Sequence, residues 1–220
     1  MNKSNNNSPN NNLHECLGDT IFFYYTFDNN LDKKLLNKIS NYSKLVFCNY
    51  DSIYITIDMN NKFHEIDNQD NYKCSNFNQS VNKLYPNLKF LSLGDRFKQS
   101  LNVLPKNLIY LNTGNSFNKR IYNLPCLIQK IRFGSDFNKL VNYLVLSLKT
   151  LVLGFNFNKK INNLPLSIEK MRLGFYFDRK LTKIPFKMKK IIFINSRFYN
   201  RKLPQFKNSN NIETQFKYKN

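Results

Sequence analysis

Apolar side chains recur along residues 77–196 of this 220-residue chain with an unvarying period of 20 residues. Each period begins at a phenylalanine. Counted from it, the apolar residues stand at offsets 0, 4, 7, 11, 14 and 16, with Thr113 as the departure from the pattern. The six leading residues are Phe77, Phe97, Phe117, Phe137, Phe157 and Phe177. Self-similarity at a fixed period is typical of repeat architectures, so the pattern predicts six consecutive units.

Within a unit the spacing predicts one short strand rather than a helix. Offsets 14 and 16 alternate as residues on one face of a strand do, whereas the complete set of apolar offsets fits no 3.6-residue period. In five units a glycine follows at offset 17 and permits a tight bend. Four units carry a proline at offset 8, which blocks a long helix there. Each unit is therefore expected to be a strand, a corner and an irregular return.

A single unit of this kind cannot fold alone. Burial of its apolar side chains contributes roughly 9 to 18 kcal/mol, whereas ordering the backbone costs about 1 to 2 kcal/mol for each residue. Stacking lets the strands pair about 4.8 Å apart in a parallel sheet and joins the apolar corners into columns. The predicted fold class is a repeat solenoid with one short parallel strand per unit and irregular returns. The strands are expected near Leu91, Leu111, Ile131, Leu151, Met171 and Ile191.

The repeat also carries a family resemblance. Residues 157–165 read Phe-Asn-Lys-Lys-Ile-Asn-Asn-Leu-Pro, are followed by Leu173 and Gly174, and resemble the FNIP repeat, which residues 117–125 match equally well. The resemblance covers about residues 77–204 and implies a leucine-rich-repeat-like solenoid. FNIP proteins often carry an N-terminal F-box and then deliver substrates to a ubiquitin ligase. We find no convincing F-box helices here, so ubiquitin-ligase components are partners by family analogy only.

The rest of the chain divides into three segments. Residues 1–12 are Asn-rich and are expected to form a disordered leader. For residues 13–76 three interpretations stay open: an N-terminal cap, degenerate first repeats, or a divergent F-box. The array takes residues 77–204, ending in a seventh unit that stops. Residues 205–220 are expected to form a mobile polar tail.

The net charge of +20 and the pI near 9.8 suggest a nucleic acid or an acidic membrane as partner. Codon usage in an AT-rich genome also enriches Lys and Asn, so the charge alone assigns no function. The sequence predicts neither a membrane-spanning helix nor a signal peptide. We therefore expect a soluble, intracellular protein, cytoplasmic in a host cell if the chain is viral, with reduced cysteines.

Motifs for catalysis are lacking in the sequence. The two histidines, His14 and His64, form no His-Glu-x-x-His motif, and no glycine is followed by Lys-Ser or Lys-Thr. The four cysteines share no metal-ligand spacing with the histidines. We expect neither an enzyme nor a bound cofactor or metal ion. Three classes of protein remain: a protein-binding scaffold, a polyanion binder, and a structural spacer.

The Phe-Asn pair that opens most units is interpreted as structural. The phenylalanines are expected to form a buried stack. Asn118, Asn138 and Asn158 are expected to hydrogen-bond backbone groups in the turns, because irregular backbone that is buried must find polar partners.

The predicted binding site lies on the outward face of the sheet. Offsets 13 and 15 flank the buried offset 14, so their side chains share the exposed face. In leucine-rich repeats, which the array resembles, the corresponding face binds partners. At offset 18, Phe155 and Phe175 are either an exposed hot spot or corner packing. The predicted protein-binding residues are Tyr110, Asn112, Lys130, Arg132, Phe155, Lys170, Arg172 and Phe175.

A ladder of cations at offsets 2 and 3 is the alternative site, for a polyanion such as nucleic acid. Stacked about 4.8 Å apart, neighbouring charges repel by roughly 0.9 kcal/mol in water, and less in salt. The ladder is therefore tolerable without a ligand, and a solvated edge is the competing interpretation. Its members are Lys119, Arg120, Lys139, Lys159, Lys160, Arg179 and Lys180.

Overall fold

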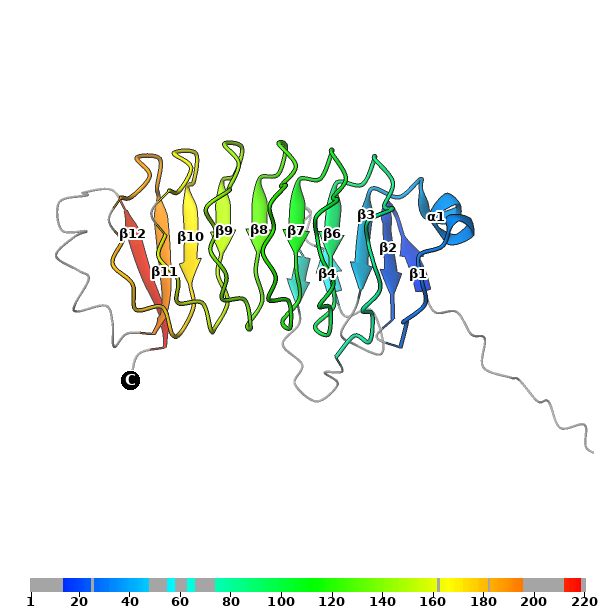
Figure 1. The fold of residues 1–220 in the computed structure, drawn as a ribbon, viewed down its shortest axis with the longest axis horizontal. Coiled ribbons are helices and arrows are strands. Elements are labelled where there is room, and N and C mark those ends of the chain that lie inside the picture. The colour runs from blue at the N-terminus through cyan, green and yellow to red at the C-terminus, as the bar shows by residue number, and fades with distance from the viewer. Residues whose placement is uncertain are drawn as a thin grey trace, which may run out of the picture.

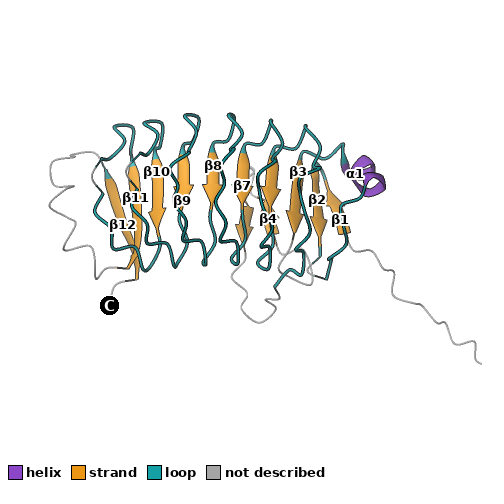
Figure 2. Cartoon of the chain, viewed as in Figure 1, coloured by secondary structure: helices purple, strands orange, loops and turns teal. Residues whose placement is uncertain are grey.

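The chain forms an elongated β-solenoid of about eight coils (Figure 1). The computed structural model describes residues 14–24, 26–47, 55–57, 63–65, 74–161, 163–181, 183–195 and 212–218. A short helix, α1 (Lys33–Ile39), lies near the N-terminal end, and strands with irregular returns make up most of the remainder (Figure 2). The predicted fold class, a repeat solenoid with one short parallel strand per unit, is confirmed.

Ten strands lie side by side in one sheet, in the order β1-β2-β3-β6-β7-β8-β9-β10-β11-β12. The strands that precede the array are β1 (His14–Leu17), β2 (Thr20–Phe23) and β3 (Lys44–Phe47). The array contributes β6 (Phe90–Ser92), β7 (Tyr110–Asn112), β8 (Lys130–Arg132), β9 (Thr150–Val152), β10 (Lys170–Leu173) and β11 (Lys190–Asn195). A separate antiparallel pair consists of β4 (Ile55–Ile57) and β5 (Phe63–Glu65).

The strands of the array pair in parallel, each shifted by one unit from its neighbour. Leu111 stands between Leu91 and Ile131, and the row continues through Leu151 and Met171 to Ile191. All of the strand positions predicted from the apolar period are therefore confirmed.

Two turns connect the strand and the return within a coil. The Phe157 amide donates to the carbonyl of Gly154 at 3.2 Å and closes the corner after the strand. The Ile168 amide donates to the carbonyl of Pro165 at 3.2 Å and closes the corner before the next strand. Such i to i+3 bonds are typical of β-turns. The period of Gly and Pro thus marks the two corners of the coil, and the return lies between them.

A column of phenylalanine rings fills the space between the sheet and the returns. The ring centroids of Phe117 and Phe137 are 6.2 Å apart, and those of Phe137 and Phe157 are 6.1 Å apart, with interplanar angles of 5° and 4°. The leading phenylalanines of all six units are at most 3% exposed. The predicted buried stack is confirmed.

The glycines at offset 17 are required by close approach between coils. A Cβ atom at Gly154 would lie 1.7 Å from the carbonyl oxygen of Gly134, and one at Gly174 would lie 1.7 Å from that of Gly154. Gly134, Gly154 and Gly174 have no positive φ, so at these three corners the bend itself does not demand glycine, whereas Gly114 has a φ of 73°. The glycine period therefore has a physical reason other than the tight bend predicted from the sequence. Backbone of one coil packs directly on backbone of the next.

The N-terminal region supplies both a cap and two degenerate coils. Strands β2 and β3 continue the sheet in register, because Leu45 stands between Ile21 and Leu91. Phe27 replaces a leading phenylalanine, and its ring centroid is 5.9 Å from that of Phe77. Strand β1 runs antiparallel to β2 and covers the edge of the sheet, which protects it from pairing with another chain.

The C-terminal segment corrects one expectation. Residues 205–220 were expected to form a mobile polar tail, yet β12 (Glu213–Tyr218) pairs in parallel with β11. The reason is that the edge of β11 offers unpaired backbone groups, and Ile212, directly before β12, packs against the core. The seventh unit, at residues 198–204, and the leader at residues 1–12 lie outside the described residues.

The close approach of the coils generates a first prediction. We expect Gly154→Ala to lower the free energy of unfolding by about 3 kcal/mol in urea denaturation, because the added methyl group overpacks the backbone contact. The control is Gly18→Ala, where φ is +55° but nothing lies within 4 Å of the added Cβ. The control should cost about 1 kcal/mol. Equal losses would refute close approach as the reason for the glycine period.

The ring column generates a second prediction. Phe137→Ala should lower the free energy of unfolding by about 3 to 5 kcal/mol, because it opens a cavity between two stacked rings. The control is Phe186→Ala, since the Phe186 side chain is 76% exposed. It should change stability by less than about 0.5 kcal/mol. A small loss for Phe137→Ala in the same denaturation assay would show that the column is not the core.

Candidate functional site

One broad surface of the solenoid is the outward side of the sheet. On β7, Leu111 is fully buried, whereas its neighbours Tyr110 and Asn112 are half-buried and face outward. The same alternation holds along β6 to β10. We call this surface the sheet face, and it consists of Phe90, Ser92, Tyr110, Asn112, Lys130, Arg132, Thr150, Val152, Lys170, Arg172, Lys190 and Ile192.

The N-terminal half of the sheet face is aromatic and polar. The Phe90 and Tyr110 rings stack with centroids 4.1 Å apart and an angle of 4°. The Lys130 ammonium lies 5.2 Å from the Tyr110 ring centroid, within the range of a cation–π contact. The Asn112 amide donates to the Ser92 hydroxyl at 3.0 Å. These contacts hold the side chains in fixed positions from one coil to the next.

The C-terminal half of the sheet face is cationic. Lys130 and Lys170 are exposed, and Arg132 and Arg172 are half-buried on either side of Val152. The two arginines line a small pocket of about 120 Å³ together with Ser135 and Phe155 among others. Lys190 pairs with Glu213 of β12 at 2.9 Å. Guanidinium groups bind carboxylates and phosphates through paired hydrogen bonds, so this half of the face suits an acidic ligand.

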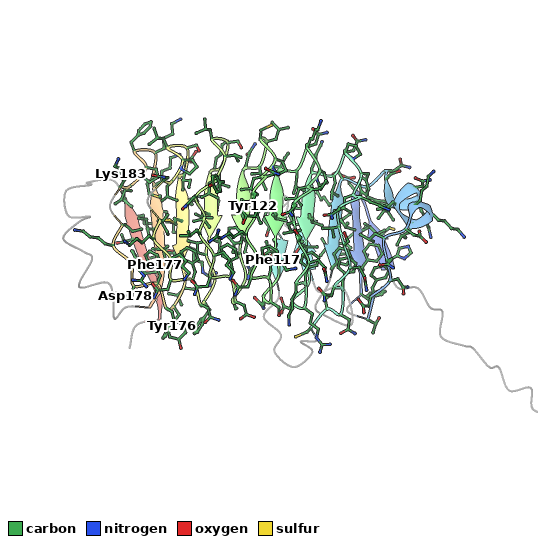
Figure 3. All side chains as sticks on the ribbon, in the orientation of Figure 1. Phe117, Tyr122, Tyr176, Phe177, Asp178 and Lys183 are labelled. Atoms are coloured by element: carbon green, nitrogen blue, oxygen red, sulfur yellow. The ribbon has the colours of Figure 1, made fainter. Side chains whose placement is uncertain are left out.

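An aromatic cluster stands at the corner next to that pocket. Phe155 and Phe175 stack at 4.9 Å, and Tyr176 meets both rings edge-on, at 5.2 Å and 5.3 Å. Phe155 is 42% exposed and Tyr176 is 52% exposed. Figure 3 shows Tyr176 at the rim of the solenoid, beside the buried Phe177. The cluster therefore combines corner packing with an exposed aromatic surface.

Tyr176 was not among the residues predicted from the sequence. It lies at offset 19, where the other units carry polar residues such as Asn156. A signal was available, because Phe175 and Tyr176 are two consecutive aromatic residues and together occupy the central positions of the turn between Gly174 and Phe177. The structure thus brings the predicted Phe155 and Phe175 together with a residue that the prediction left out.

The cationic ladder lies on the returns rather than on the sheet. Most of its members are exposed, and Lys139 is half-buried. The Arg179 Nε atom donates to the carbonyl of Asn158 at 3.2 Å, which ties one cation to the neighbouring coil. The two predicted sites are therefore on separate surfaces of the solenoid, with the phenylalanine column between them.

The asparagines at offset 1 hold the returns together. The Asn118 side-chain oxygen accepts from the backbone amide of Asn138 at 3.0 Å. In the same way the Asn138 side-chain oxygen accepts from the backbone amide of Asn158 at 3.0 Å, and the Asn158 side-chain oxygen accepts from that of Asp178 at 3.1 Å. The predicted bonds from these side chains to backbone groups are confirmed. Asp28 plays the same part in the N-terminal coil, accepting from the Asn78 amide at 3.3 Å.

Comparison with models of known protein families gives no match, and a search of curated proteins finds no relative of the chain. Within the described ranges, no three His, Cys, Asp or Glu side chains gather closely enough to hold a metal ion. The helical part of those ranges offers no segment that is long and apolar enough to cross a membrane.

The asparagine ladder generates a third prediction. Asn138→Ala should lower the free energy of unfolding by about 1 to 2 kcal/mol, because the Asn158 amide loses its acceptor in the corner. Asn138→Asp should cost less, since a carboxylate oxygen can accept the same bond, as that of Asp28 does for Asn78. Both values come from urea denaturation. Equal losses in the two variants would show that the side-chain oxygen is not the group that matters.

Proposed function

We propose that the chain is a protein-interaction scaffold that presents the sheet face to a partner. The observation that carries the proposal is the meeting of the exposed aromatic cluster with the arginine-lined pocket at the C-terminal half of that face. Aromatic and Arg side chains dominate the binding energy of protein interfaces. A site with both at one corner of a rigid sheet has the composition of an interface centre.

The fold supports such a function because a solenoid offers an extended, rigid surface. Each coil contacts its neighbours alone, so the side chains at offsets 13 and 15 can change without disturbing the core. These positions range from Phe90 and Tyr110 to Lys170 and Arg172, whereas the core offsets stay apolar. Variation of this kind lets a partner be selected by surface residues while the column remains constant.

The charge on the sheet face specifies the chemistry of the partner. Lys130, Arg132, Lys170 and Arg172 stand on β8 and β10, and Asp and Glu are absent from β6 to β10. We infer an acidic protein segment that places carboxylates over this half and an apolar side chain against Phe155 and Tyr176. The resemblance to FNIP repeats is in keeping with a scaffold, and membership of that family is part of the proposal.

The partner is first identified by affinity capture from cell extract treated with nuclease, so that nucleic acid cannot bridge. We expect the double variant Lys130→Glu with Lys170→Glu to weaken the binding of the partner at least tenfold, measured as Kd by titration calorimetry. Phe155→Ala with Tyr176→Ala should weaken it by a similar factor, since both remove contacts at the interface centre.

The matched control reverses two exposed cations on the returns, Lys119→Glu with Lys159→Glu, which changes the net charge by the same amount. This variant should bind with a Kd within about threefold of the original, because long-range attraction alone is screened by salt. If both charge reversals weaken binding equally, the partner responds to net charge and the sheet face is not the site.

A further inference from the structure

The returns form a second surface with a composition of its own. We call this surface the return face, and it comprises the exposed side chains at offsets 2 to 11, in residues 79–88, 99–108, 119–128, 139–148, 159–168 and 179–188. These segments contain no Asp or Glu. Their cations are Lys83, Lys106, Lys119, Arg120, Lys139, Lys159, Lys160, Arg179, Lys180, Lys183 and Lys187. All charged residues of the return face are therefore positive, whereas the acidic residues of the array lie at the corners and beside the strands.

Exposed apolar side chains gather on the same surface. Among the described residues, twelve large hydrophobic side chains are exposed, and eight of them belong to the return face. They are Val103, Tyr122, Leu127, Leu140, Tyr143, Leu146, Leu166 and Phe186. A solvated edge would not need them, so the cations alone do not describe the surface.

Three of these side chains form a row on consecutive coils. Leu146, Leu166 and Phe186 all stand at offset 9 and are 82%, 61% and 76% exposed. Each follows directly on the residue whose carbonyl closes the turn before the strand, such as Pro165 or Pro185, so it occupies the tip of that turn. The residues at offset 8 pack inward while those at offset 9 protrude. The row is thus held outward by the fold and cannot turn into the core.

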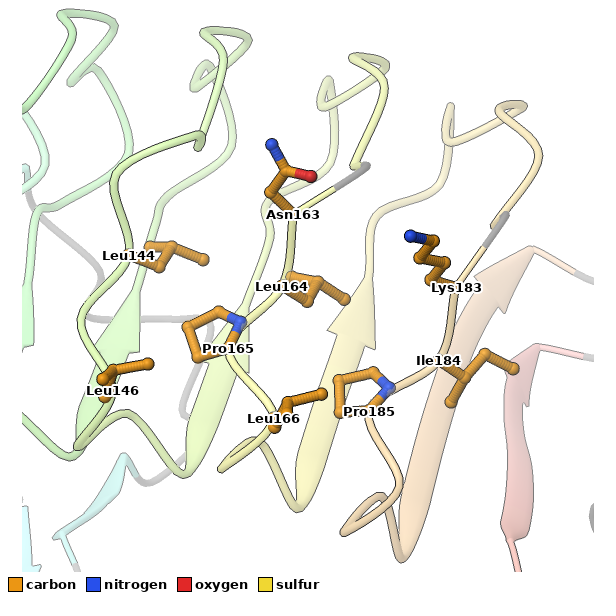
Figure 4. Close-up of a pocket in the computed structure, with 9 residues that line it drawn as sticks. All are labelled: Leu144, Leu146, Asn163, Leu164, Pro165, Leu166, Lys183, Ile184 and Pro185. Atoms are coloured by element: carbon orange, nitrogen blue, oxygen red, sulfur yellow. The ribbon is translucent and has the colours of Figure 1, made fainter.

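Between these coils the returns leave a shallow groove of about 340 Å³, lined mostly by apolar side chains (Figure 4). Leu146 and Leu166 are among the residues that line it, and Lys183 is the cation in that lining. The Lys187 ammonium lies 5.8 Å from the Phe186 ring centroid, so cation and apolar group alternate on one corner. Tyr122 and Tyr143 approach each other at 6.5 Å on neighbouring returns.

We propose that the return face docks on an anionic lipid surface, without crossing it. Protruding Leu and Phe side chains can enter the boundary between headgroups and acyl chains, while Lys and Arg remain at the phosphates. Tyrosine is enriched at that depth of a bilayer because its ring is apolar and its hydroxyl is polar. A face without carboxylates experiences no repulsion from acidic lipids.

Nucleic acid explains this surface less well. The phosphates of a nucleic acid would pair with the cationic ladder, which is the alternative site predicted from the sequence. They provide no apolar environment for the three protruding side chains at offset 9. Lipid accounts for both the charge and the apolar row. A molecule bound in this way would keep its sheet face turned away from the membrane, because the two surfaces lie on opposite sides of the phenylalanine column.

The chain contains no tryptophan, so a single introduced indole reports on one surface. Phe186→Trp should show a blue shift of its emission and quenching by brominated acyl chains when phosphatidylcholine vesicles containing phosphatidylserine are added. Tyr110→Trp places the same reporter on the sheet face and should show neither change. Vesicles of phosphatidylcholine alone should bind much more weakly, because the cations find no net negative surface.

The apolar row is tested by the triple variant Leu146→Ser, Leu166→Ser and Phe186→Ser in vesicle co-sedimentation of the full chain. We expect its affinity for the anionic vesicles to fall at least tenfold. The matched control removes three exposed apolar side chains from elsewhere, Leu17→Ser, Ile109→Ser and Tyr176→Ser, and should bind normally. Circular dichroism of each variant checks that the sheet is intact.

Several outcomes would overturn the proposal. One is equal vesicle binding by the triple variant and the original chain, and another is a spectral shift for Tyr110→Trp in place of Phe186→Trp. Binding of a DNA or RNA duplex that is tighter than vesicle binding and unchanged in the triple variant would assign the cations to nucleic acid. Self-association that the triple variant abolishes, with no vesicle binding, would assign the row to a second copy of the chain.

Discussion

Direct stacking of backbone on backbone is the constraint on which the rest of this structure depends. The strands can pair in register because the corners also approach, and at Gly154 that approach leaves no room for a Cβ atom. Identical coils then bring identical side chains into columns, so one phenylalanine per unit is enough to build a continuous core. Asparagine oxygens complete the same contact on the returns, where no strand ladder is available.

The stacking also separates the chemistry of the two broad surfaces. Along the strands, alternate side chains must point outward, and these positions hold aromatics at one end and paired Lys and Arg at the other. Along the returns, the tips of the turns point outward, and there apolar groups accompany cations. The same backbone repeat therefore supports a protein-binding proposal on one side and a lipid-binding proposal on the other, and each can be altered without disturbing the core.

The N-terminal coils, which lie outside the glycine period, vary in the length and structure of their returns. The N-terminal coil replaces part of its return by α1, and Asp32 caps that helix by accepting from the Leu35 amide at 2.8 Å. A longer excursion separates β3 from Phe77, and β4 and β5 belong to it. Despite both changes the ring centroids of Phe27 and Phe77 are 5.9 Å apart, close to the spacing within the array, so the ring column continues into the altered coils. The column therefore extends beyond the part of the chain that keeps the 20-residue period.

The sequence by itself determined the parts of this protein that repeat. A constant period of 20 places equivalent residues beside one another, so the strand positions, the Phe stack and the asparagine bonds at Asn118, Asn138 and Asn158 could be predicted. Only the tertiary structure decided the pairings between segments of unequal spacing. β2 and β3 join the sheet across irregular connections, and β12, which lies outside the 20-residue pattern, pairs with the edge of β11 through its backbone. Phe155 and Phe175 stand one period apart, so their contact follows from the repeat, whereas Tyr176 has no aromatic counterpart in the other units and only the structure adds it to the cluster.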